Sequence, residues 1–168
     1  MIYQEEYARY SRILYAACLR ILANAEEAEE AMHDVLLHYF SFSGRFDSEE
    51  QKKSWLFKVA ASKSIDRLRK KHTVLFEDLG EEAEEHEGQG LCEDLDTAAR
   101  VRRIKEAMRL LAPGYRAVLS LFLFEGYDFD EIAGLLSIRA ATVRSQYVRG
   151  RAKLRALLLE KDKWIRND

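Results

Sequence analysis

The residues best suited to chemistry in this sequence are the cations, hydroxyls and one amide that recur between positions 139 and 151. Arginine can bind guanine through two hydrogen bonds, glutamine can bind adenine in the same way, and further arginines can contact phosphates. These side chains predict contact with duplex DNA, although helix packing is an alternative role for Thr142. The predicted contact residues are Arg139, Thr142, Arg144, Ser145, Gln146, Arg149 and Arg151.

The segment that carries these residues has the pattern of two helices joined by a tight turn. Ile132 and Leu136 would face the core from a short first helix, and the turn falls at 137–139. Val143 and Leu154 would then anchor a longer second helix, whose outer face keeps the arginines. This layout predicts a helix-turn-helix, in which the second helix enters the major groove of DNA. An antiparallel helical hairpin with a solvated basic face is the alternative.

Charge is distributed unevenly along the 168 residues, although the formal net charge is only −2. Residues 1–72 carry 12 Lys/Arg and 11 Asp/Glu, residues 73–99 carry no Lys/Arg and 10 Asp/Glu, and residues 100–168 carry 15 Lys/Arg and 8 Asp/Glu. The local balances of +1, −10 and +7 add up to the net −2. The near-neutral total therefore hides a basic C-terminal part that suits a nucleic-acid partner.

Helical spacing of apolar residues organises the chain into two units. The first unit has predicted helices over 3–22, from Asn24 to near Ser43, and over about 49–71, where Asn24 and Ser48 are the expected N-caps. Residues 77–96 have little to bury and repel one another, so they predict a flexible linker. We therefore predict an all-α fold of two small helical bundles joined by an acidic flexible linker. The C-terminal bundle contains the helix-turn-helix.

The second unit begins near Thr97 and is interrupted at Pro113 and Gly114, after which a helix from Tyr115 to Phe124 is expected. The sequence contains few features that would indicate an enzyme, a metal site or a membrane protein. The sequence has no glycine-rich phosphate loop, no metal-ligand spacing and no run of 18 apolar residues, so we predict no catalytic site, no cofactor, no metal and no membrane insertion. Cys18 and Cys92 stand alone, which is typical of a reduced cytoplasmic protein. A disulfide between them is the alternative.

Two groups of motifs in this order resemble the bacterial extracytoplasmic-function sigma factors, which are promoter-specificity subunits of RNA polymerase. The matching text comprises residues 28–37, 55–60 and 66–71 in the first unit, and 113–119, 125–127, 131–133 and 142–146 in the second. Three positions depart from the family's pattern. Ser137 replaces the glycine common at the turn, Ser62 stands where Asn is frequent, and His33 stands where Gln is usual.

The resemblance implies an alternative sigma factor that is not itself catalytic. It assigns residues 1–72 to a region-2-like domain for the minus-10 element and core polymerase, 73–99 to a linker, and 100–168 to a region-4-like domain for the minus-35 element. The minus-35 element would be read as duplex and the minus-10 element as single strand. The implied partners are promoter DNA, the clamp helices of the largest polymerase subunit, the polymerase flap and an anti-sigma factor. An anti-sigma factor in the membrane would hold this cytoplasmic protein at the inner membrane.

Within the first domain, cations of the loop near residue 45 and of the following helix are the expected contacts of the minus-10 strand: Arg45, Lys52, Lys53, Lys58, Lys63, Arg67 and Lys70. Trp55 and Phe57 have either core packing or base stacking as roles. A mostly acidic helix face is expected to dock on the clamp helices, with a merely solvated face as the alternative: Glu29, Glu30, His33, Asp34 and Leu37.

The acidic linker over 73–99 sets how far apart the two domains can act. Fully extended, it would reach about 90 Å, which exceeds one DNA turn of about 34 Å. The two domains are therefore expected to grip separate elements at once. Alternatively, the linker folds onto the arginine-rich helix of its own chain and masks it. A free-standing regulator that uses only the helix-turn-helix is the alternative function.

Overall fold

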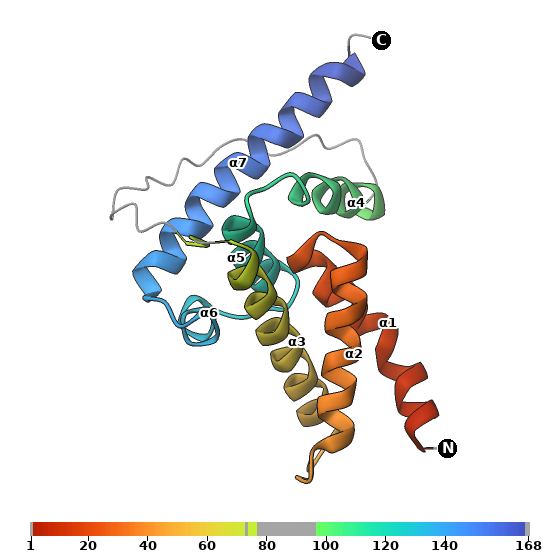
Figure 1. Cartoon of the computed structure of the whole chain (residues 1–168). Coiled ribbons are helices and arrows are strands. Elements are labelled where there is room, and N and C mark those ends of the chain that lie inside the picture. Colours follow the sequence, from red (N-terminus) through yellow and green to blue (C-terminus); the bar gives the residue numbers. More distant parts are fainter. Residues whose placement is uncertain (1, 73, 77–96, 167–168) are drawn as a thin grey trace.

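The computed structural model describes residues 2–72, 74–76 and 97–166, with side chains up to Glu160 (Figure 1). This part of the chain contains helices and no strand, which confirms the predicted all-α fold. The helices are α1 (Ile2–Leu22), α2 (Ala25–Ser41), α3 (Glu49–Lys71), α4 (Thr97–Met108), α5 (Pro113–Leu123), α6 (Phe129–Leu136) and α7 (Ala140–Arg166). The linker predicted as flexible falls largely outside the described residues.

Helices α1, α2 and α3 form the first module, in which consecutive helices run in opposite directions (Figure 1). Both predicted N-caps are confirmed. The Asn24 side chain accepts a hydrogen bond from the Glu27 N–H at 3.0 Å, and the Ser48 hydroxyl accepts one from the Gln51 N–H at 3.1 Å. Each bond satisfies one of the N–H groups that the first turn of a helix leaves without a partner.

Helices α4 to α7 form the second module. α5 begins at Pro113, two residues before the predicted Tyr115, because proline is favoured at the first helical position, where its missing N–H costs nothing. Asp128 caps α6 by accepting a hydrogen bond from the Glu131 N–H at 2.8 Å. Ser137 then ends α6 in the left-handed conformation, with φ 54° and ψ 44°, and α7 starts three residues later.

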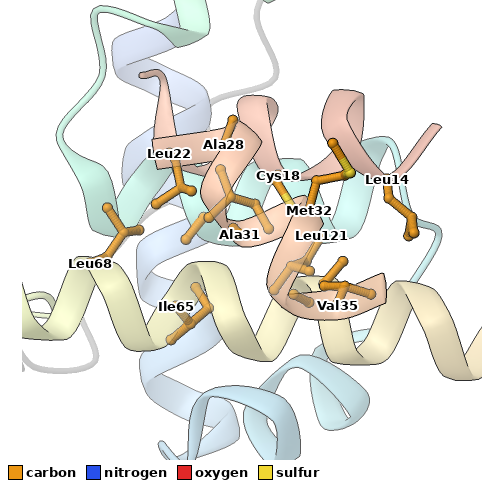
Figure 2. Packing of buried hydrophobic residues seen from close by; sticks show 14 of the residues in the cluster. Leu14, Cys18, Leu22, Ala28, Ala31, Met32, Val35, Ile65, Leu68 and Leu121 are labelled. Atoms are coloured by element: carbon orange, nitrogen blue, oxygen red, sulfur yellow. The ribbon is translucent and has the colours of Figure 1, made fainter. Parts of the chain in front are cut away.

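The two modules, which the sequence predicted as bundles joined by a linker, pack against each other. α5 lies on α1, and α3 contacts both α5 and α6. Figure 2 shows Leu121 of α5 among buried side chains of the first module, such as Met32 and Val35. The reason lies in α5, which is apolar on nearly all sides. One of its faces contributes Leu119 to a cluster with α4 and α7, and another contributes Leu121 to the core of the first module.

Cys18 of α1 belongs to this shared cluster, as Figure 2 shows, and is a fully buried free cysteine. Burial raises the pKa of its thiol, because the thiolate would lose its hydration there. The helices of the described part include none with an apolar stretch long enough to cross a bilayer.

Candidate nucleic-acid interface

The helix-turn-helix is built from α6, the Ser137 turn and α7. Ile132 and Leu136 of α6 and Val143 of α7 are completely buried, as the sequence pattern predicted. Three rings join the helices that hold this motif. Phe122 of α5, Phe129 of α6 and Tyr147 of α7 lie with ring centroids 4.7 to 5.1 Å apart. The start of α7 is therefore fixed relative to α5 and α6 by apolar and aromatic packing.

The seven predicted DNA contacts on this motif differ in exposure. Arg139, Arg144 and Arg151 are exposed, and Ser145 and Arg149 are half-buried. Thr142 and Gln146 are 8% and 3% exposed, so in this conformation neither side chain can reach a base edge. The burial of Thr142 agrees with the packing role that was its alternative.

Gln146 lies beside the chain that leaves the first module. Its side chain lines a small pocket together with His72, Val74 and Leu75, and with the start of α5. The chain that follows α3 also lies very close to α5. A Cβ atom on Gly114 would lie only 2.2 Å from the Leu75 carbonyl oxygen, so residue 114 has no room for a side chain. The backbone of Leu75 is thus packed directly against α5.

The predicted minus-10 contacts also fall into two groups. Arg45, Lys53, Lys58 and Lys70 are exposed, and Lys63 is half-buried. Lys52 and Arg67 instead make ion pairs within the first module. The Arg67 guanidinium donates to Glu30 and to Asp34 of α2, each at 2.8 Å.

Lys52 lies at the centre of a polar cluster between α1 and α3. Its ammonium group is 3.1 Å from carboxylate oxygens of both Glu6 and Glu49, and its side chain is 15% exposed. Burial alone would lower the pKa of Lys52, but the hydrogen bonds to Glu49 and Glu6 outweigh it and raise the pKa above its ordinary value. The structure thus gives Lys52 a role in joining the helices, and its contact with DNA stays a prediction.

Aromatic side chains gather where α2 meets α3, beside the exposed Arg45. The Trp55 ring lies 4.8 Å from Phe42, 5.5 Å from Phe46 and 5.4 Å from His38, measured between centroids. Trp55 is half-buried and packs against the core cluster, as Phe57 does. Core packing, one of the two roles considered for both residues, therefore agrees with the structure, and the Trp55 cluster also supports the loop that carries Arg45.

The mostly acidic face of α2 has the exposure that a docking surface needs. Glu29, Glu30 and Leu37 are exposed, and His33 and Asp34 are half-buried. His33 stacks on the ring of Tyr7, and its Nε2 lies 3.1 Å from the Tyr7 hydroxyl. Because Arg67 pairs with Glu30 and Asp34, this face is less negative than its sequence alone indicated.

The polar residues that join the two modules were not predicted from the sequence. Arg116 of α5 is 6% exposed and donates hydrogen bonds to backbone carbonyls of α1. Arg20 of α1 pairs with Glu125, which follows α5. An arginine among Ala117, Val118 and Leu119 was a signal in the sequence, because a cation on a buried face needs specific acceptors. In the described residues, no group of three or more His, Cys, Asp or Glu side chains is placed to hold a metal ion.

Comparison with known proteins adds two family matches. Residues 7–73 match "Sigma-70 region 2", and residues 101–154 match "Sigma-70, region 4". The chain is 28% identical over 162 residues to the ECF RNA polymerase sigma factor SigW of Bacillus subtilis, covering 89% of this chain and 84% of that protein. It is 27% identical over 159 residues to the RNA polymerase sigma factor CarQ of Myxococcus xanthus, covering 94% and 90%.

A solved structure has a similar fold. It is the sigma factor RpoE of Bartonella quintana, crystallised with the anti-sigma factor NepR. The likeness covers 92% of this chain and 95% of that one, with a TM-score of 0.55 and 21% sequence identity. At this level of identity the comparison supports the helical architecture alone.

Proposed function

Because the chain belongs to the extracytoplasmic-function sigma factors, alternative sigma factors that direct transcription, we propose that its two modules read two promoter elements. The second module, within 100–168, binds the minus-35 element as duplex DNA. The first module, within 1–72, binds the minus-10 element as a single strand and docks on core RNA polymerase. The chain is a specificity subunit, and sigma factors are not catalytic themselves.

The helix-turn-helix of the second module carries the proposal for the minus-35 element. Arg144 is exposed on the first turns of α7, and the burial of Val143 beside it fixes the direction of the helix. The leading turns of a recognition helix are those that approach base edges. An arginine at such a position discriminates guanine from other bases by roughly 1–3 kcal/mol. Arg149 and Arg151 follow one to two turns later and are suited to phosphates, which add salt-dependent affinity.

The loop between α2 and α3 supports the proposal for the minus-10 element. It joins the exposed Arg45 to a cluster of rings around Trp55. Pulling a base from the duplex costs a few kcal/mol, and stacking contacts return about 1–3 kcal/mol per base. Each further base-pair step costs on the order of 1.4 kcal/mol. The first module can therefore hold one or two bases, and wider opening requires the polymerase complex.

Docking on polymerase is proposed for the α2 face that includes Glu29, Glu30, His33, Asp34 and Leu37. Leu37 is 67% exposed, which suits an apolar anchor within a charged interface. The clamp helices of the largest subunit are the proposed partner of this face, and the flap is the proposed partner of the second module. An anti-sigma factor is a further proposed partner, by analogy with the complex of RpoE with NepR. The proposed place of action is the cytoplasm, where polymerase is found.

Run-off transcription tests the proposal most directly. Core bacterial RNA polymerase and the full chain are combined with a library of promoter fragments, and initiation from a defined subset is expected. Arg144→Ala should weaken initiation on preferred promoters and relax the preference at one minus-35 position, by roughly 1–3 kcal/mol. Arg102→Ala removes the same charge from an exposed site on α4 and serves as the control.

Two outcomes would contradict the proposal. If no template were transcribed, the chain would not act as a specificity subunit under these conditions. If the chain bound duplex promoter DNA specifically and gave no polymerase-dependent initiation, the free-standing regulator would be the better interpretation.

A further inference from the structure

The loop between α2 and α3 is attached by backbone hydrogen bonds to Tyr39 at its start and to Lys52 at its end. It covers residues 42–48 and lies at the opposite end of the first module from α4 (Figure 1). The Phe42 N–H donates to the Tyr39 carbonyl at 3.1 Å. The Ser48 carbonyl accepts a hydrogen bond from the Lys52 N–H, also at 3.1 Å. The positions of Tyr39 and Lys52 therefore determine where the loop begins and ends.

Aromatic rings hold the loop between these two ends. The ring cluster consists of Phe42, Phe46 and Trp55. The Phe42 ring lies 5.3 Å from that of Phe46 and 4.8 Å from that of Trp55, measured between centroids. Tyr39 lies 6.3 Å from Phe46 by the same measure. Gly44 allows this packing, because a Cβ atom there would lie 2.3 Å from the Phe42 ring. A shift of Tyr39 would therefore move the ring cluster.

A polar network holds Tyr39 and Lys52 and joins all three helices of the first module. The Tyr39 hydroxyl donates to Glu6 Oε2 at 2.6 Å, and the Lys52 ammonium group is 3.1 Å from the same oxygen. Lys52 is also 3.1 Å from Glu49 Oε2, and the hydroxyl of the buried Tyr10 donates to the other oxygen of Glu49. The network thus consists of Glu6 and Tyr10 of α1, Tyr39 of α2, and Glu49 and Lys52 of α3.

Charges are balanced around this network. Lys52 is one of two cations at this place, and the other, Arg9, lies 3.9 Å from Glu6. Arg9 is also 3.7 Å from Glu49, so two carboxylates face two cations. Burial and the hydrogen bond to Glu6 raise the pKa of Tyr39 to about 12, so at neutral pH its hydroxyl retains the proton that it donates. Because partly buried charges need partners, removing one member of the network leaves another unpaired.

The same contacts bear on the predicted role of Lys52. Its side chain is 15% exposed, and Glu6 and Glu49 hold its ammonium group. A phosphate could reach this group only by displacing a carboxylate. Arg45, in contrast, is exposed on the loop itself. Lys52 is therefore placed to act on the loop rather than on the strand.

We propose that Glu6, Tyr39 and Lys52 are positioning residues for the reading of the minus-10 strand, because they hold the loop that carries Arg45 and the ring cluster. Discrimination among bases depends on the direction and distance of such contacts, whereas attraction of phosphates depends mainly on charge. A loosened loop should therefore lose base preference before it loses general affinity for the strand. The use of this loop for the minus-10 strand rests on the proposed function, whereas the hold on the loop rests on contacts within this chain.

The first test measures base preference with Glu6→Gln and Tyr39→Phe in the full chain. Core polymerase is added, and initiation from a promoter selected in the run-off assay is compared with initiation from derivatives that carry single-base changes in the minus-10 element. Each variant should reduce this ratio by about fivefold, since each removes a hydrogen bond or ion pair of the network. Affinity for core polymerase should stay at the wild-type level. The loss in Glu6→Gln is informative, because losing a negative charge by itself strengthens binding to DNA.

The second test measures the loop without polymerase or DNA. The chain has two tryptophans, so Trp164→Phe leaves Trp55 of the ring cluster as the only one in the sequence. Both variants, made in this form, should increase the quenching of Trp55 fluorescence by acrylamide, because a looser loop lets the quencher reach the ring. Circular dichroism shows whether each variant is folded, and either variant decides the question if the other does not fold.

Two exposed residues of α1 provide matched controls. Glu5→Gln removes the same charge as Glu6→Gln. Tyr3→Phe removes the same hydroxyl group as Tyr39→Phe. Neither control should change the base preference or the quenching of Trp55.

Unchanged base preference in folded Glu6→Gln and Tyr39→Phe variants would overturn the positioning role, whatever the quenching. Lys52→Met gives a further check. If it weakened binding equally on all promoters and lowered the salt dependence while the other two variants matched the wild type, Lys52 would be a phosphate contact instead. If both variants increased quenching and the wild-type chain supported no initiation, the hold on the loop would stand and the proposed function would fall.

Discussion

Leu37 is a large apolar side chain that α2 turns into solvent, with 67% of its surface exposed. Neighbouring positions on this helix carry charge, and Arg67 neutralises part of it by pairing with Glu30 and Asp34. Replacing Glu30 or Asp34 by a basic residue would break its ion pair with Arg67, in addition to any effect on the binding of polymerase. Leu37 has no such intramolecular role in the core, so its substitution separates docking from folding more cleanly.

Leu37→Glu is expected to weaken binding to core polymerase by about tenfold or more. Burial of a leucine side chain contributes roughly 1.5–3 kcal/mol, and tenfold corresponds to about 1.4 kcal/mol. Affinity can be measured by titrating labelled core polymerase with the full chain. Leu159→Glu, on α7 with 48% exposure, is the control. Equal affinities for the two variants would argue against docking through α2.

Sequence patterns identified charges at the residue scale but not their partners. The positive charge of Lys52 was evident, and its position between Glu6 and Glu49 was not, because Glu6 lies on a different helix. Gln146 was predicted to read bases from its place on α7. Its side chain is buried and lies beside residues that follow α3, far away in the sequence. Tertiary contacts of this kind leave no local periodicity.

At the scale of helices, local rules were more reliable. The caps at Asn24 and Ser48 were predicted because a side-chain oxygen at the N-cap acts over three residues only. The left-handed turn at Ser137 was expected from the glycine that the family usually has there. A residue with a Cβ atom is disfavoured in this conformation, so this turn stores local strain.

Ser137→Gly should therefore stabilise the chain by about 1 kcal/mol. Urea denaturation of the two proteins would measure the difference in the free energy of unfolding. Ser62→Gly, at an exposed position inside α3, is the matched control and should be destabilising by about 0.5 kcal/mol. Destabilisation by both substitutions would mean that the Ser137 side chain has a stabilising role that outweighs the strain.

At the scale of the whole molecule, the sequence predicted which faces are apolar but not what covers them. α5 shows the limit, because the sequence predicted a helix there but not that the helix would be buried against both α1 and α7. The contact with α1 depends on Arg116 meeting the end of a helix more than ninety residues earlier. No spacing rule reaches across such a separation.

A shared core predicts cooperative unfolding. Calorimetry of the full chain should give one transition, because buried residues of both modules form one cluster. Arg116→Gln should broaden this transition or divide it into two, since it weakens the contact between the modules. Two well-separated transitions in the wild-type chain would show instead that the modules unfold independently.

The buried Cys18 makes the packing of the two modules measurable by the rate of thiol alkylation. Its thiol is buried and its pKa is raised, so an alkylating reagent added to the folded protein should react very slowly. Alkylation requires the structure around Cys18 to open. In a Cys92→Ser variant, the rate of alkylation would therefore report how often this opening occurs. Core polymerase added to the tube should accelerate alkylation if it pulls the halves apart, which makes one sulfur atom a reporter of holoenzyme assembly in real time.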